Sequence, residues 1–120
     1  MTEANDNVID MTVIETLREL GGDDDPGLVG ELIDLYLLDA PDRLRELEQA
    51  LEGGDVDLLE RAAHTLKSAS ANIGAVLLSD LCQDLECLAR EAPIEKAGDL
   101  VAQSLEAFGE VQRALNELKG

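Results

Sequence analysis

The sequence has almost no aromatic residues and few basic ones. It contains no tryptophan, one tyrosine and one phenylalanine, and nine basic residues stand against 27 acidic ones, for a net charge of −18. Nucleic-acid-binding surfaces need basic side chains to neutralise phosphates, and single strands also need aromatic rings on which bases stack. Anionic lipid surfaces would repel such a chain as well. We therefore expect neither nucleic acid nor a membrane as a partner.

Targeting and membrane-spanning signals are missing too. The N-terminal stretch MTEANDNVID has neither the basic region nor the apolar core of a signal peptide. No apolar run approaches the length of a membrane span. The two cysteines, Cys82 and Cys87, would lie about 140° apart on one helix, so they should neither bridge each other nor share a metal. These features favour a cytoplasmic protein with reduced thiols.

Leucine and alanine are abundant. Hydrophobic residues make up 45% of the 120 positions, which is enough for a real core and far above the content of disordered acidic chains. Leucine and alanine are strong helix formers, so the composition favours an all-α fold. The length fits one domain over residues 1–120, with residues 1–8 as a flexible lead.

Glycine and proline divide the chain into a series of helices. Apolar residues recur at helical spacing in each segment, and no alternation typical of a strand competes with them. Gly21-Gly22, Gly53-Gly54 and Gly74 should end the first three helices. The expected helices run over about 10–20, 27–52, 56–72, 76–91 and 95–118. Their lengths and short connections predict an antiparallel four-helix bundle with a short N-terminal helix as a lid, monomeric because the bundle buries its own seams.

Helix starts and one interruption can also be predicted. Asp25-Pro26 offers an N-cap followed by proline at the first helical position, and Asp55 can cap the helix after it. Pro41 falls inside the second segment and predicts either a kink or a break beside Asp39. In the first helix, four apolar residues share one side: Val13, Ile14, Leu17 and Leu20.

His64 is the single histidine, and its place on the third helix is informative. The core-facing residues of that helix are Leu59, Ala62, Leu66, Ala69 and Ile73. At about 100° per residue, His64 points roughly 170° away from the centre of that apolar seam. Lys67 follows at i+3, while Ser68 at i+4 and Ala71 at i+7 are small and leave the ring open to a partner. By spacing alone, an ordinary surface histidine beside an ordinary surface lysine is an equally good interpretation.

A lone histidine excludes several kinds of site. A carboxylate-bridged metal centre in a bundle would need histidines on paired helices, and only one histidine is present. Serines occur at 68, 70, 79 and 104, but no sequence feature pairs one of them with the ring as a catalytic nucleophile would require.

The stretch HTLKSASANIG followed by LCQDLE, read as a whole, resembles the histidine-containing phosphotransfer (HPt) domains of phosphorelays. That family has a histidine, a lysine three residues later, small residues after it and a glycine ten residues after the histidine. His64, Lys67, Ser68 and Gly74 occupy these positions. The upstream segment DAPDRLRELEQALEGGDVDLLERAAH is also similar, and the likeness covers roughly residues 10–118.

The resemblance implies both the activity and the site residues. His64 would accept a phosphoryl group from a receiver-domain aspartate and pass it to another receiver, and Lys67 would offset the phosphoryl charge. Glu86 matches the position whose side chain orients the imidazole, with an ordinary solvated carboxylate as the alternative. Arg90, one turn on, is expected to support phosphate or partner contacts. The chain would be a carrier and not an enzyme, without cofactors of its own, because Mg²⁺ and the acidic pocket belong to the receiver.

Docking residues and alternatives complete the set of expectations. The receiver-docking patch would consist of Ser68 and Ala71 together with Val13 and Leu17 of the first helix. Alternatively, the two first-helix residues only close the end of the bundle. Ser68 stands where the family usually has glycine, and we expect function to survive. A kinase dimerisation domain is disfavoured, because Thr65 and Ala69 replace its usual acidic residue and proline.

Two further possibilities stay open. One is an HPt-type domain excised from a hybrid or chemotaxis kinase, although a start methionine favours a free-standing protein. The other is a helical interaction bundle with an inert histidine.

Overall fold

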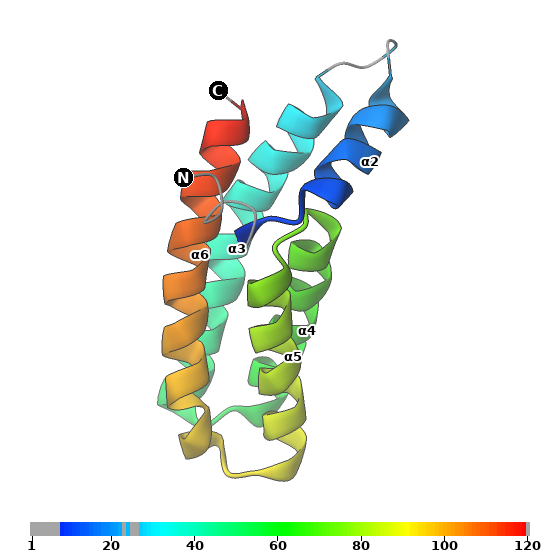
Figure 1. Ribbon diagram of the computed structural model, residues 1–120. Helices are drawn as coiled ribbons and strands as arrows, with labels where there is room; N and C mark the ends of the chain where they lie inside the picture. The colour runs from blue at the N-terminus through cyan, green and yellow to red at the C-terminus, as the bar shows by residue number, and fades with distance from the viewer. Residues whose placement is uncertain (1–7, 23, 25–26, 120) are drawn as a thin grey trace.

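The computed structural model describes residues 8–22, 24 and 27–119, and this part of the chain is helical with no strand. The elements are α2 (Met11–Gly21), α3 (Leu28–Gly53), α4 (Val56–Asn72), α5 (Val76–Glu91), the short 3₁₀ helix η1 (Ile94–Ala97) and α6 (Gly98–Lys119). Helices α3 to α6 form the bundle, and α2 lies against α3 beyond the ends of α4 and α5 (Figure 1). The predicted all-α four-helix bundle with a short N-terminal helix is confirmed.

Several helix ends carry caps, among them the predicted one at Asp55. Asp55 accepts a hydrogen bond from the Leu58 amide at 3.0 Å, and Asp10 caps α2 through the Thr12 amide at 3.0 Å. Gly22 and Gly54 take positive φ angles just after α2 and α3, where glycine is favoured. The predicted Asp25-Pro26 cap lies outside the described residues, and α3 begins at Leu28 after Gly27.

Of the kink or break predicted beside Asp39, the break is wrong. Helix α3 runs without interruption through Pro41 from Leu28 to Gly53. Ala40 and Leu44 are buried on either side of the proline, so packing against the neighbouring helices holds the backbone helical despite the lost amide hydrogen bond.

The core is a leucine- and isoleucine-rich interior with one buried polar link. Tyr36 of α3 and Ser70 of α4 hydrogen-bond through their hydroxyls at 2.8 Å, and burial raises the pKa of Tyr36 so that its hydroxyl keeps its proton. The spacing of Leu20 groups it with the apolar side of α2, but its side chain is 73% exposed. The reason is that α2 ends one residue later, beyond the bundle. The fully buried large apolar side chains include Ile33, Leu47, Leu59, Leu66, Leu78, Leu85 and Leu115.

The start of α2 is fastened to the turn between α4 and α5. The Asp10 amide donates to the Gly74 carbonyl at 2.7 Å, and Ile9 beside it is buried. Val8, which the sequence assigned to a flexible lead, is half-buried against the core; the rest of that lead, residues 1–7, lies outside the described residues. Gly74 has φ +84°, and a Cβ there would lie 2.8 Å from the Asp10 carbonyl oxygen.

We predict that Gly74→Ala destabilises the protein by about 1–3 kcal/mol, because the added methyl group meets backbone and the left-handed conformation penalises any residue with a Cβ. The measurement is chemical denaturation followed by circular dichroism. Gly109→Ala is the matched control: it lies inside α6, a methyl group would meet nothing within 4 Å, and it should stabilise by about 1 kcal/mol. Equal effects of the two substitutions would contradict the close approach at Gly74.

Candidate functional site

His64 lies near the middle of α4 with its side chain 62% exposed, as the helical spacing predicted. Ala62, Ala63 and Leu66 of the same helix are buried, so the core side of α4 faces away from the ring. Ser68 and Ala71 are both exposed on the following turns. The ring is therefore open to a large partner, because the residues at i+4 and i+7 are small.

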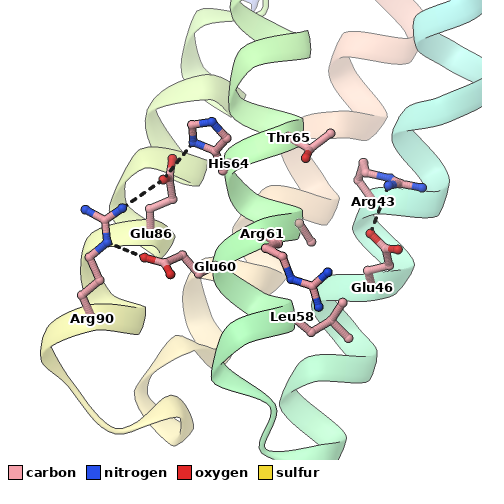
Figure 2. A pocket seen from close by; sticks show the side chains of 10 residues that line it. Arg43, Glu46, Leu58, Glu60, Arg61, His64, Thr65, Glu86 and Arg90 are labelled. Atoms are coloured by element: carbon pink, nitrogen blue, oxygen red, sulfur yellow. Dashed lines mark hydrogen bonds and ion pairs between the residues drawn. The ribbon is translucent and has the colours of Figure 1, made fainter.

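Glu86 of α5 is the buried anchor of the site. Its side chain is only 5% exposed, which excludes the alternative of a solvated carboxylate, and its Oε2 lies 3.1 Å from His64 Nδ1 (Figure 2). Burial alone would raise the pKa of Glu86, but hydrogen bonds and charge from Lys67 and His64 outweigh it and hold the pKa below its ordinary value. Glu86 is thus a carboxylate that can only accept, so its contact with His64 Nδ1 favours a proton on that nitrogen; in a neutral ring this tautomer has its lone pair on Nε2.

Lys67 is held on the same carboxylate. Its Nζ lies 2.6 Å from Glu86 Oε1 and donates to Gln83 Oε1 at 3.0 Å. The side chain is 25% exposed, so the ammonium group still reaches the surface beside the ring. The two oxygens of Glu86 therefore hold the imidazole and the ammonium group side by side.

Arg90 lies at the outer edge of the site. Its guanidinium group pairs with Glu60 of α4, and Nη2 is 3.8 Å from Glu86 Oε2. The hydrogen bond to Glu60 raises the pKa of Arg90. Arg90 thus links α5 to α4 one turn below the ring.

The two cysteines differ in their surroundings. Both are free, with Cys82 buried and Cys87 exposed. Burial, followed by the charge of Glu86, raises the pKa of Cys82 to about 12. Its thiol therefore stays protonated behind the site and is no nucleophile.

An apolar groove lies where α2, α3 and α4 meet. Leu17 lines it, as the sequence-based docking patch requires, and Val13 is half-buried near Gly74 without lining the groove. Leu35 of α3 is 62% exposed at its edge. We call this the apolar groove; its lining residues are Leu17, Leu32, Leu35, Tyr36, Asp39, Ala69, Asn72 and Ile73.

Sequence reasoning missed several residues around the ring. Gln83 binds Lys67, and Ser79 donates to the Lys67 carbonyl oxygen at 3.1 Å. Gln83 precedes Glu86 by three residues, so it shares that face of α5 and could have been found once Glu86 was placed. The pairing of Arg90 with Glu60 could not have been found from the sequence, because it depends on how α4 and α5 are aligned.

Neither a metal site nor a membrane span is found in the described part of the chain. No group of three or more potential metal ligands comes together among residues 8–22, 24 and 27–119. No helix in those ranges is both long and apolar enough to cross a membrane.

A helical bundle with an exposed histidine, held by a buried carboxylate, is the arrangement of proteins in which a partner reaches the ring at the surface. Comparison with known proteins gives the family: the model of the Hpt domain matches residues 31–120. The crystal structure of histidine-containing phosphotransfer protein B from Pseudomonas aeruginosa PAO1 is similar over 93% of this chain and 94% of that chain, with 35% identity and a TM-score of 0.84. A search of curated proteins gave no match.

The chain belongs to the Hpt domain family, as the sequence motif predicted. Members of this family are phosphotransfer carriers rather than kinases, and they interact with receiver domains and kinases in phosphorelays. A histidine phosphotransfer role in a phosphorelay follows for this chain.

We predict a pH-dependent stability difference between the wild type and Glu86→Gln. Because the folded-state pKa of Glu86 is lowered, its carboxylate stabilises the fold fully above its ordinary pKa of 4.5, and this contribution is lost as pH falls through the lower folded value. Denaturation at several pH values should therefore show the wild type more stable at pH 6, with the gap closing toward pH 3. Glu91→Gln, on the exposed side of α5, gives the baseline for losing a carboxylate. A gap between wild type and Glu86→Gln that stays constant with pH would contradict the ion-paired carboxylate.

Proposed function

We propose that this chain accepts a phosphoryl group on His64 Nε2 from a receiver-domain aspartyl phosphate and passes it to the aspartate of another receiver. The observation that carries this proposal is the contact of the buried Glu86 carboxylate with His64 Nδ1 at 3.1 Å. With the Nδ1 proton held there, the Nε2 lone pair is directed outward from an exposed ring.

The transfer step needs no further nucleophile or base. The Nε2 lone pair attacks phosphorus, the N–P bond forms, and the P–O bond to the aspartate breaks with its electron pair returning to the carboxylate. The ring stays protonated on Nδ1, and its developing positive charge is stabilised by Glu86. The reverse sequence delivers the phosphoryl group to the next receiver.

Lys67 supplies the charge that the phosphoryl oxygens need. Its ammonium group is anchored by Glu86 and Gln83 in the immediate neighbourhood of the ring. A lysine on a flexible stem can exchange one of these contacts for a phosphoryl oxygen. Mg²⁺ would be contributed by the receiver, where it neutralises the same group from the other side.

The receiver would dock over Ser68 and Ala71 and along the apolar groove. Both small residues are exposed and let a partner surface approach the ring. Leu17, from α2, would contribute from the groove, and Val13 from the adjoining turn of the same helix. We expect a monomer, with receiver domains or a hybrid kinase as partners. A free-standing carrier and a domain of a larger kinase use the site identically.

The test is phosphorylation by phosphoramidate, a small-molecule donor to histidines, read by intact mass at alkaline pH. We predict one acid-labile phosphoryl group on the wild type and none on His64→Gln, whose fold should be unchanged because His64 is exposed. No addition to folded wild-type protein would overturn the proposal and favour an interaction bundle with an inert histidine.

The labelled protein is then mixed with a panel of receiver domains and Mg²⁺. A receiver that gains the label as the carrier loses it is the accepting receiver. Its gain should disappear when its phospho-accepting aspartate is replaced by asparagine.

A further inference from the structure

A second groove is lined by residues of α3, α4 and α5 (Figure 2). Along α4 its lining residues fall within 58–65, whereas those of the apolar groove fall within 69–73. We call it the arginine groove, after Arg43 of α3 and Arg61 of α4, which line it with Leu58 and Thr65. Its volume is about 400 Å³, and His64 is one of its lining residues.

The charges in this groove differ from those of the chain as a whole. The sequence has three acidic residues for each basic one, yet the groove is lined by three arginines and three glutamates. Each of these glutamates already has a partner. Glu86 contacts His64 and Lys67. Glu60 pairs with Arg90, and Glu46 pairs with Arg43 at 3.4 Å.

Arg61 is left without a partner. It has no ion pair and no side-chain hydrogen bond with any residue in the described ranges, although acidic residues are abundant. Arg43 is only partly satisfied, because its Nε is buried and has no hydrogen bond, and its contact with Asp39 is long at 3.9 Å. Two guanidinium groups in one groove thus retain unused donors, and guanidinium donors match the geometry of a carboxylate.

The direction of Arg61 separates it from the phosphoryl site. It precedes His64 by three residues on the same helix, but its side chain extends past Leu58 toward α3, away from the ring (Figure 2). The cation beside the ring is Lys67. Arg61 is therefore positioned to meet a partner's side chain and not the transferred group.

We propose that Arg61, with Arg43, forms a subsite that binds a carboxylate side chain of the docked receiver domain. This inference rests on the proposed function, since the receiver brings the carboxylate when it docks on His64. A chain with net charge −18 repels free anions, whereas a carboxylate on a docked surface arrives at high effective concentration. With the apolar groove on one side of His64 and the arginine groove on the other, the receiver can bind in only one orientation.

The experiment compares Arg61→Gln and Arg43→Gln with the wild type and with Arg113→Gln. Arg113 is a matched control: it is exposed on α6 and has no ion pair within the described ranges. Phosphoramidate labelling of His64 should be equal in all four proteins, because this small donor carries no receiver carboxylate that would bind Arg43 or Arg61. Thermal unfolding of the variants checks that each is folded.

Transfer to the accepting receiver should separate the variants. We expect Arg61→Gln to lower kcat/KM for transfer about five- to tenfold, by raising KM while kcat stays unchanged. The kcat/KM of this variant should also depend less on salt concentration than that of the wild type. Arg43→Gln should act in the same direction, and Arg113→Gln should match the wild type.

Four results would overturn the subsite. Arg61→Gln could transfer within twofold of the wild type, or Arg113→Gln could lose as much. Loss of phosphoramidate labelling in Arg61→Gln alone would instead place this residue at the ring. If the wild type is labelled but transfers to no receiver, the proposed function itself fails, and the subsite falls with it.

Discussion

The site depends on one buried carboxylate that serves two cationic or proton-donating partners. Glu86 places one oxygen 3.1 Å from His64 Nδ1 and the other 2.6 Å from Lys67 Nζ. A carboxylate that is 5% exposed is costly to bury, and these contacts offset the cost. Because both partners come from α4 and the carboxylate comes from α5, the packing of these two helices fixes the geometry of the ring.

The rest of the bundle keeps that pair of helices in place. On the core side of α4, Ser70 hydrogen-bonds Tyr36 of α3, and Leu59 and Leu66 are fully buried. At its end, Gly74 accepts the backbone hydrogen bond that fastens α2 beside the apolar groove. The two sides of α4 therefore differ: one is packed against the core, and the other carries the exposed His64 between the apolar groove and the arginine groove.

Much of this arrangement could be predicted from the sequence. Helical periodicity and glycine positions gave the bounds of the first four helices to within one residue, and the angular position of His64 follows from 3.6 residues per turn. The last helix was expected from 95, but Ile94–Ala97 forms a separate 3₁₀ helix and α6 begins at Gly98. The roles of Lys67 and Glu86 came from the family motif, and the structure brings both residues to the ring. Periodicity alone could not have paired Glu86 with His64, because that contact crosses 22 residues of chain.

The misses have a common physical cause. Pro41 argues locally for a break, but the buried residues on either side of it keep α3 continuous. Leu20 follows the apolar pattern of α2 but lies past the end of the bundle. The Glu60–Arg90 pair, and the lack of a partner for Arg61 within the described ranges, depend on how neighbouring helices are aligned, which no single-helix pattern records. Local rules failed where tertiary packing decides.

The central claim is that Glu86 fixes the protonation of the His64 ring, and ¹⁵N NMR of the imidazole tests it most directly. The long-range ¹H–¹⁵N spectrum of the unphosphorylated protein, at a pH where the ring is neutral, distinguishes the two tautomers. The account predicts the Nδ1–H tautomer in the wild type and a mixture or the opposite tautomer in Glu86→Gln. A wild-type ring protonated on Nε2, or a spectrum that Glu86→Gln leaves unchanged, would contradict it.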